Sequence, residues 1–258
     1  MPMVLLRAGD DRSAPLVCVH PVTGRGDVYR ALADVMDWPG PVFGIDAPAP
    51  PPPLPDDQGY RLDELASRYV DELDLRMPPL LLGWSLGGVI AAEMSRVIAE
   101  RGSTVRFLGV IDSRAPQPEM RQRPADRDTL SRAFLQNAAL SRELEPPAPL
   151  ASSRVSDLQT ALLALGDIAN DEEVERRLQI FMGLVRGLYR HVAQPVPVTL
   201  HLFESAEAHP SHPRPPTLGW EALAPRLERR VVAGTHFSLL APQRIAALAA
   251  TIGKEIPR

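Results

Sequence analysis

The chain has 258 residues, of which 45% are hydrophobic and 23% are charged, proportions that are ordinary for a globular protein. Its formal net charge is −4 and no long run of one charge sign occurs, which argues against nucleic acid or an anionic membrane surface as the main partner. No stretch approaches the ~18 consecutive apolar residues of a transmembrane helix, and residues 1–7 lack the basic-then-apolar order of a signal peptide.

The first 112 residues predict strands that alternate with helices. Short apolar runs are typical of buried strands, and apolar residues that recur every three or four positions are typical of helices. In chain order we expect a strand at 16–19, a helix at 28–36, a strand at 42–45, a helix at 61–76, a strand at 80–82, a helix at 89–101 and a strand at 105–111. This alternation indicates the α/β class, with a mostly parallel central sheet and helices on both faces.

The alternation stops after Asp112. Helical patterns without a convincing strand follow, at about 130–138, 155–165 and 174–192. Strands are again expected at 196–203 and 228–232, and a helix at 243–252 ends the chain. We therefore expect one domain over residues 1–258, in which residues 114–192 form an inserted helical lid over the carboxyl edge of the sheet, where such folds bind ligands.

The segment Gly83–Gly88 reads Gly-Trp-Ser-Leu-Gly-Gly and lies between a predicted strand and a predicted helix. A serine in a sharp strand-to-helix turn between glycines is the nucleophile arrangement of the α/β-hydrolase fold. The glycines avoid clashes where the backbone folds back on itself, and the helix N-terminus points amide hydrogens at the reacting oxygen. The pattern predicts a serine hydrolase with Ser85 as its nucleophile.

A serine nucleophile needs a base, and His236 is the predicted one. In this fold the catalytic residues follow the chain order serine, acid, histidine, and His236 lies in a loop between the strand at 228–232 and the last helix. His209 and His212 could be read as a metal pair, but no cysteine or acidic cluster accompanies them, so no metal site is expected.

The acid must hold the imidazole in its tautomer and stabilise its charged form. Asp112 ends the strand that follows the predicted nucleophile helix, so it should emerge beside the serine. Glu204 ends the next strand along the chain and is the alternative, because many hydrolases of this fold carry the acid there. Asp112 is the preferred acid.

Two backbone amides should bind the oxyanion that forms during acyl transfer. Leu86, next to the nucleophile, should supply one, and Val22, in the loop after the first strand, the other. His20 is expected to shape that loop without reacting. Cys18 is the only cysteine and lies within the strand, so we expect a buried apolar group that forms no internal disulfide, and a cytoplasmic protein.

With these residues in place, the chain resembles the type I thioesterase domains that end nonribosomal peptide and polyketide assembly lines. Gly83–Gly88 is the most specific match. Further likeness lies in the oxyanion motif at 17–24, the segments 41–48 and 108–113, and the Gly-Thr-His-Phe loop at 234–237. A variable helical lid after the acid is also a trait of that family.

The resemblance implies release of an acyl or peptidyl chain from the phosphopantetheine arm of a carrier protein, which would be the partner. His236 would deprotonate Ser85, and the resulting acyl-enzyme would be resolved by hydrolysis or by macrocyclisation. The enzyme itself would need no cofactor, because the phosphopantetheine belongs to the carrier protein.

Three other hypotheses about the function remain open at this point. The free-standing type II editing thioesterases usually carry Gly-His-Ser-Met-Gly and a later acid, so Trp84, Leu86 and Asp112 favour the chain-releasing enzymes. A serine hydrolase of small esters is a second alternative, and a hydrolase-like binding protein is a third.

Overall fold

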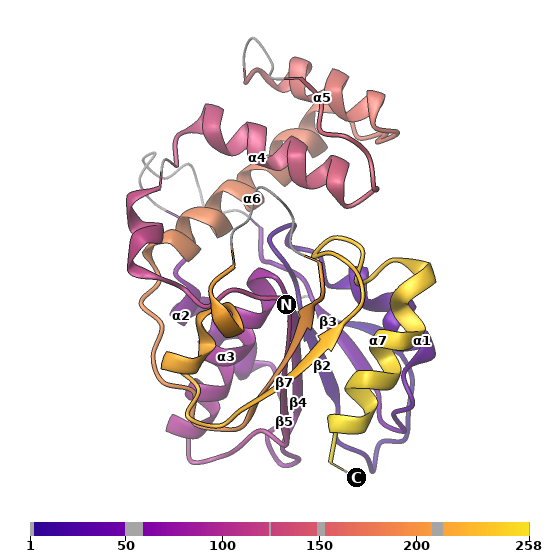
Figure 1. The fold of residues 1–258 in the computed structure, drawn as a ribbon, viewed down its shortest axis with the longest axis vertical. Helices are drawn as coiled ribbons and strands as arrows, with labels where there is room; N and C mark the ends of the chain where they lie inside the picture. Colours follow the sequence, from indigo (N-terminus) through magenta and orange to yellow (C-terminus); the bar gives the residue numbers. More distant parts are fainter. Residues whose placement is uncertain (1–2, 50–58, 124, 149–152, 208–213, 258) are drawn as a thin grey trace.

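The computed structural model describes residues 3–49, 59–123, 125–148, 153–207 and 214–257. Its strands form one seven-stranded sheet in the order β1-β3-β2-β4-β5-β6-β7 (Figure 1). The strands are β1 (Met3–Arg7), β2 (Leu16–Val19), β3 (Val42–Ile45), β4 (Leu80–Trp84), β5 (Phe107–Ile111), β6 (Leu200–Ser205) and β7 (Leu227–Val232). Neighbouring strands are parallel except β1 and β3, which are antiparallel. This arrangement confirms the α/β class and the mostly parallel sheet.

Helices cover both faces of this sheet. The α-helices are α1 (Arg30–Val35), α2 (Leu62–Asp71), α3 (Leu86–Glu100), α4 (Arg127–Leu140), α5 (Val155–Ala164), α6 (Asp171–Arg190) and α7 (Pro242–Glu255), and the short 3-10 helices are η1 (Gly26–Tyr29), η2 (Pro118–Gln122) and η3 (Pro216–Ala222). Helices α2 and α3 pack together on one face, and α1 and α7 on the other (Figure 1). Within the described ranges, no helix has the length and apolar character needed to cross a bilayer.

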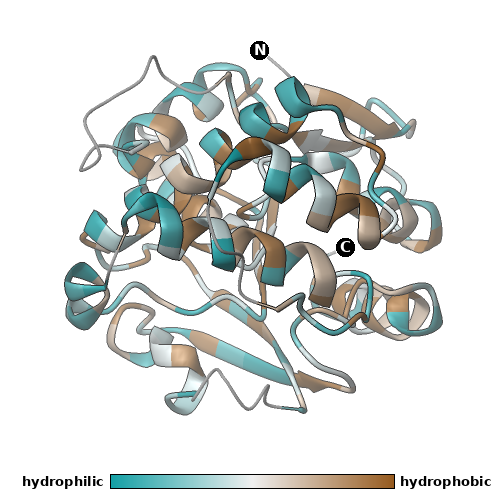
Figure 2. Ribbon diagram, turned by 90° about the horizontal axis from the view of Figure 1, so that it is seen from above, coloured by the Kyte–Doolittle hydropathy of each residue, from teal (hydrophilic) through white to brown (hydrophobic). Residues whose placement is uncertain are grey.

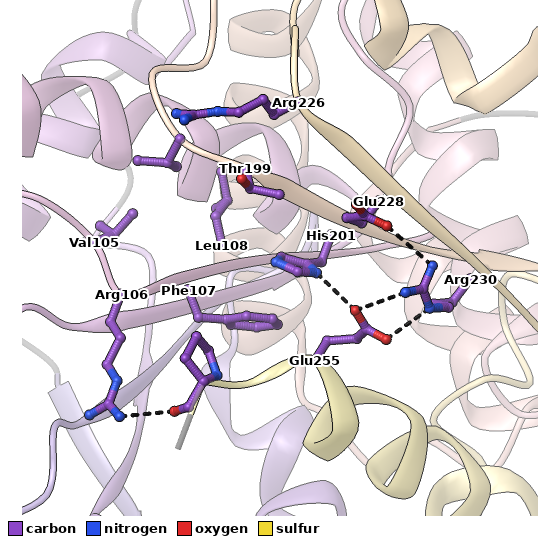
Figure 3. A pocket seen from close by; sticks show the side chains of 12 residues that line it. Val105, Arg106, Phe107, Leu108, Thr199, His201, Arg226, Glu228, Arg230 and Glu255 are labelled. Carbon is purple, nitrogen blue, oxygen red and sulfur yellow. Dashed lines mark hydrogen bonds and ion pairs between the residues drawn. The ribbon is translucent and has the colours of Figure 1, made fainter.

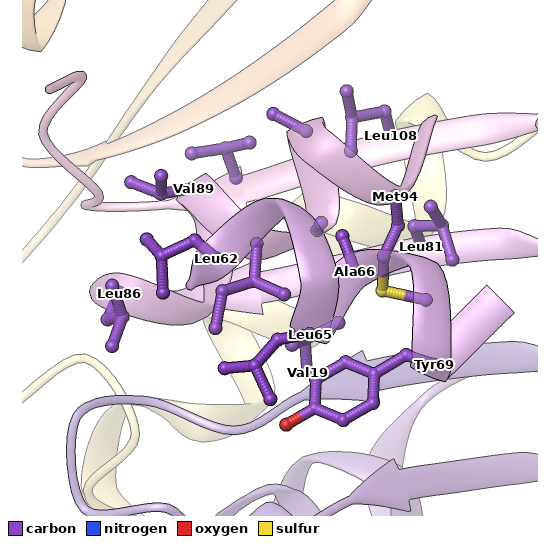
Figure 4. Packing of buried hydrophobic residues seen from close by; sticks show 14 of the residues in the cluster. Val19, Leu62, Leu65, Ala66, Tyr69, Leu81, Leu86, Val89, Met94 and Leu108 are labelled. Atoms are coloured by element: carbon purple, nitrogen blue, oxygen red, sulfur yellow. The ribbon is translucent and has the colours of Figure 1, made fainter. Parts of the chain in front are cut away.

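The central strands are buried on both faces, which explains their uninterrupted apolar sequences. Every residue of β2 and β4 is buried. Val19 and Leu81 pack with side chains of α2 and α3 such as Tyr69 (Figure 4), whereas Cys18 and Leu82 point to the opposite layer. Cys18 is therefore the buried apolar group that the sequence predicts, and burial raises the pKa of its thiol.

Three helices occupy the carboxyl end of the sheet. Between β5 and β6 the described residues form helices and no strand, as the sequence predicts. Helices α4, α5 and α6 share an apolar core of their own, and the Asp167 carboxylate ties Arg142 to Arg177 at 2.9 Å each. The three helices lie above the sheet in Figure 1, and Figure 2 views them from that end, with polar and apolar residues interspersed along them.

The structure differs from the sequence prediction at several boundaries. Strand β1 is not predicted, because Leu6 is its only buried residue and its pairing partner β3 is distant in sequence. Helix α2 ends at Asp71 instead of 76, and α3 starts at Leu86 instead of 89. Strand β6 starts at Leu200 instead of 196, because Pro197 has no N–H for the ladder.

Candidate active site

Ser85 lies in the tight turn between β4 and α3. Its backbone has φ 56° and ψ −128°, a combination that a residue with a side chain rarely adopts. The Ser85 N–H donates to the Ile111 carbonyl at 3.0 Å, and the Ser85 carbonyl accepts from the Gly88 N–H at 3.1 Å. These bonds hold the strained turn at the carboxyl end of the central strands β4 and β5.

The glycines around the serine have no room for a side chain. A Cβ on Gly83 would lie 2.1 Å from the Gly87 carbonyl oxygen, and a Cβ on Gly87 would lie 2.2 Å from that of Val19. A Cβ on Gly88 would meet the Cβ of Ser113 at 2.5 Å. Because these distances are far inside van der Waals contact, the turn requires glycine at all three positions.

Asp112 and His236 lie far apart in sequence and contact each other directly. The His236 Nδ1 is 2.9 Å from Asp112 Oδ2, and Asp112 Oδ1 accepts the Ser205 N–H at 2.8 Å. Asp112 leaves β5 with a φ of 41° and is 6% exposed. When Nδ1 of a neutral imidazole donates to the carboxylate, Nε2 keeps its lone pair and can accept a proton.

The surroundings of Asp112 favour its ionised form. Burial by itself raises the pKa of this carboxyl, but His236, the Ser205 amide and Arg214 together hold the pKa of Asp112 below its ordinary value. Arg214 Nη2 lies 3.7 Å from Asp112 Oδ2. A buried carboxylate that stays ionised is the group that can stabilise an imidazolium beside it.

Glu204, the alternative acid, has a different partner. Its carboxylate accepts from Arg229 Nε at 2.6 Å, between the neighbouring strands β6 and β7. The structure therefore brings Asp112, and not Glu204, against His236. The sequence did not indicate the two other residues that contact Asp112. These are Ser205, at the end of β6, and Arg214, in the segment after it.

The loop that carries His236 packs against Trp84. The Trp84 Nε1–H donates to the His236 carbonyl at 3.2 Å, and the two ring centroids are 5.3 Å apart. The ring of Phe237 meets the imidazole edge-on at 5.0 Å, and Gly234 turns the loop with a φ of 116°. Trp84 thus holds His236 in place, and its position next to Ser85, the predicted nucleophile, was the only signal of this role in the sequence.

The amides of Val22 and Leu86 belong to residues that line the same cavity as Ser85. Leu86 is the first residue of α3, so its N–H has no acceptor inside the helix. In the part of the chain that the structure describes, neither N–H donates to a backbone carbonyl.

His20 shapes the loop that carries Val22. Its Nδ1 is 2.8 Å from the Pro21 carbonyl oxygen and its Nε2 is 2.7 Å from the Tyr69 hydroxyl. The ring is fully buried, and burial lowers the pKa of His20 to about 4. His20 is therefore neutral near pH 7 and is bonded at both nitrogens, which agrees with a structural role.

Ser85, Asp112 and His236 line one cavity of about 290 Å³ below the three helices. Its apolar wall comes mainly from α4 and α6, through Ala133, Leu140, Phe181, Val185, Leu188 and Tyr189. Gln136 and Asn137 of α4 add polar groups. Helix α6 also packs on the loop after β2, since a Cβ on Gly24 would lie 2.5 Å from Ile180 Cγ2.

A larger hollow of about 530 Å³ lies at the opposite end of the sheet (Figure 3). Glu255 pairs there with Arg230 at 2.8 Å and with His201 at 3.3 Å, and the described lining holds no serine or cysteine. No three described His, Cys, Asp or Glu residues form a group that could hold a metal ion. His209 and His212 lie outside the described residues. The cavity at Ser85 is therefore the candidate active site.

Comparisons with known proteins point to one family. The family model for the thioesterase domain matches residues 14–256. Malpinin synthetase of Mortierella alpina is 29% identical over 138 residues, a match that spans 52% of this chain and 2% of that protein. The chain therefore corresponds to a small part of such relatives.

Solved structures share the fold. One is a four-domain nonribosomal peptide synthetase bound to AMP and glycine, with a TM-score of 0.86 and 22% identity over 99% of this chain and 20% of that one. Another is the type II thioesterase BorB from the borrelidin biosynthetic cluster, with a TM-score of 0.65 and 20% identity over 99% of this chain and 97% of that one. Together with the family match, they confirm the α/β-hydrolase fold that the sequence predicts.

Proposed function

Because the chain belongs to the thioesterase domain family and is a hydrolase, we propose that it is a cytoplasmic enzyme that releases an acyl or peptidyl chain from the phosphopantetheine arm of a carrier protein, through an acyl-enzyme on Ser85. The observation that carries this proposal is the 2.9 Å contact between His236 and Asp112 in the cavity that Ser85 also lines. An acid, a histidine and a strained serine in one cavity are the parts that acyl transfer requires.

The catalytic cycle begins at His236. With Nδ1 bonded to Asp112, Nε2 accepts the Ser85 hydroxyl proton while Oγ attacks the thioester carbonyl carbon. The described residues form no hydrogen bond between Ser85 and His236, and such bonds often tighten only when substrate binds. The carbon–sulfur bond then breaks, the proton passes from Nε2 to the leaving pantetheine thiol, and the acyl group stays on Ser85.

The amides of Val22 and Leu86 stabilise the oxyanion of this step. Both belong to residues at the cavity that contains Ser85, and an amide without a backbone acceptor is free to bind a developing negative charge. The positive end of α3 adds to this stabilisation. A neutral His20 keeps the Val22 loop in place.

The inserted residues 114–192 act as the lid of the site. Helices α4 and α6 line the cavity with mostly apolar side chains, so the acyl chain of the substrate lies against them. The apolar wall limits water around the acyl-enzyme. Whether water or a hydroxyl or amine of the bound chain completes the reaction depends on how the chain folds in this space, so hydrolysis and macrocyclisation are both products of the same site.

We favour chain release over editing, although the fold is shared with both kinds of enzyme. Trp84 and Leu86 beside the nucleophile support chain release, because the editing enzymes usually carry histidine and methionine at these two positions. Asp112 directly after β5 supports the same choice.

The test is acylation with a panel of pantetheine thioesters, from acetyl to long peptidyl chains. Intact-mass spectrometry detects the adduct, and chromatography separates free acids from rings. We expect an adduct with long chains on the wild type and none on Ser85→Ala. Ser103→Ala is the control and should form the adduct, because Ser103 lies after the end of α3 and does not line the cavity. A clear preference for acetyl would favour the editing enzyme, and turnover of p-nitrophenyl esters alone would favour a small-ester hydrolase. An adduct on Ser85→Ala would refute the assignment of the nucleophile.

A further inference from the structure

The charged residues of the active-site cavity are mostly positive. Besides Asp112 and His236, the described charged residues that line it are Arg114, Arg123 and Arg214. Asp112 bonds His236, and Arg214 lies 3.7 Å from this carboxylate while donating to the Ser205 carbonyl at 2.5 Å and to the Glu207 carbonyl at 2.7 Å. Arg214 and Asp112 therefore offset each other, and Arg114 and Arg123 are the two further positive charges among the described residues of the lining.

Arg114 extends from a rigid segment next to the acid. The flanking carbonyl of Ser113 accepts from the buried Trp220 Nε1 at 2.7 Å, and the flanking N–H of Ala115 donates to Leu218 at 3.0 Å. These two bonds fix the backbone on both sides of Arg114, two residues beyond Asp112. Its half-buried side chain therefore enters the cavity from a defined position.

Arg123 approaches the cavity from the end of η2. Its N–H donates to the carbonyl of Met120, a buried residue that also lines the cavity, at 3.1 Å. The guanidinium carbon lies 5.9 Å from the ring centroid of Tyr189 on α6, within the range of a cation–π contact. The segment after β5 and helix α6 thus both contribute to this part of the wall.

The two guanidinium groups are close enough to repel. Burial, and then the charge of Arg123, lower the pKa of Arg114, whereas Glu119 raises it. Glu119 is exposed and is not among the residues that line the cavity. Arginine stays protonated in proteins, so an anion that enters between the two side chains would relieve their repulsion and accept forked hydrogen bonds.

We propose that Arg114 and Arg123 form an anion-binding subsite in the active-site cavity, which selects thioester substrates that carry a negatively charged oxygen group away from the reacting carbonyl. The inference rests on the proposed thioesterase function and adds the substrate class. The group is either a carboxylate of the acyl chain or the phosphate of the phosphopantetheine arm, which share charge and acceptor oxygens.

Two comparisons of substrates distinguish the carboxylate of the acyl chain from the phosphate of the arm. The first pair compares N-acetylcysteamine thioesters of dicarboxylic acids that carry a free carboxylate with the same thioesters as uncharged primary amides, at several chain lengths. The second pair consists of one neutral acyl group on pantetheine and on phosphopantetheine. Because hydrogen bonds between charged groups are stronger than those between neutral groups, we expect the charged member of at least one pair to have a kcat/KM roughly tenfold or more above its neutral partner.

Variants that remove one positive charge test whether Arg114 and Arg123 cause the preference for charged substrates. Arg114→Gln and Arg123→Gln should each bring the charged-to-neutral ratio toward one. Arg121→Gln is the matched control, because it removes one exposed charge two positions from Arg123 and does not line the cavity. If Arg114→Gln does not fold, the exposed Arg123 still allows the test.

The outcomes are distinct. A ratio near one in both pairs, or a preference that persists in the variants, overturns the anion subsite while turnover of the neutral thioesters leaves the thioesterase function standing. Absence of turnover for every thioester overturns the proposed function, and the subsite with it. A preference that rising salt weakens, and that the two variants abolish, supports the subsite.

Discussion

Replacing Asp112 with asparagine tests the central contact of the site. Asp112 is 6% exposed and accepts hydrogen bonds from His236 Nδ1 at 2.9 Å and from the Ser205 N–H at 2.8 Å. Asparagine keeps the size of the side chain and one acceptor oxygen, so the Ser205 bond can persist. It loses the negative charge that stabilises the imidazolium, and its amide group can favour the wrong tautomer of His236.

The expected loss follows from this geometry. Replacing the aspartate of a serine triad with asparagine lowers kcat by about 10⁴-fold, which corresponds to about 5 kcal/mol in activation free energy. We expect a loss of this size in kcat/KM for an acyl thioester, measured by release of the free thiol. Thermal unfolding should still show one cooperative transition, which would exclude general misfolding as the cause.

Glu204→Gln is the matched control. Glu204 has a similar exposure of 8% and also contacts an arginine, but its partner is Arg229 instead of the histidine. We expect its activity to stay within a fewfold of wild type. Residual activity above a tenth in Asp112→Asn, or a larger loss in Glu204→Gln, would show that Glu204 or another residue supports His236.

Three further variants test the surroundings of the site. Trp84→Phe removes the 3.2 Å bond to the His236 carbonyl and should lower kcat/KM about fivefold, the equivalent of about 1 kcal/mol for one hydrogen bond; an unchanged rate would argue against the positioning role. Gly87→Ala would place a Cβ 2.2 Å from the Val19 carbonyl oxygen and should reduce the free energy of unfolding in urea by about 2 kcal/mol or more, whereas Gly253→Ala in α7, which meets nothing within 4 Å, should keep or raise it. His20 has a pKa lowered to about 4 by burial, so the unfolded chain binds a proton that the folded chain does not between about pH 6.5 and pH 4. The free energy of unfolding should therefore decrease as the pH is lowered through this window, by up to about 3 kcal/mol at its lower end. His20→Gln should flatten this dependence of stability on pH, and an equal slope in both proteins would contradict a buried, neutral His20.

Features that depend on residues close together in the sequence could be predicted. The turn at Ser85 depends on glycines within a few residues of it, so their order alone indicates a strand, a sharp turn and a helix. The central strands read as continuous apolar runs because both of their faces are covered. The helices between β5 and β6 could be recognised from their apolar periodicity.

Features that depend on long-range packing could not be predicted. The edge strand β1 pairs with β3 through backbone hydrogen bonds that leave little trace in side-chain pattern. Three features of the site also could not be predicted from the sequence. They are the packing of Trp84 against His236, the contacts of Ser205 and Arg214 with Asp112, and the presence of Arg114 and Arg123 in one cavity wall. Each of these groups joins residues from different elements, and periodicity describes only one element at a time.

The choice of the acid illustrates this division. The sequence by itself predicted a nucleophile at Ser85 and two candidate acids at the ends of neighbouring strands, Asp112 and Glu204, of which it favoured Asp112. Only the tertiary structure shows which carboxylate contacts His236, because the loop after β7 packs on Trp84 and brings His236 to Asp112, while Glu204 bonds Arg229. Local pattern determines which elements form, whereas the direction in which a loop returns across the sheet depends on contacts between residues that the sequence separates.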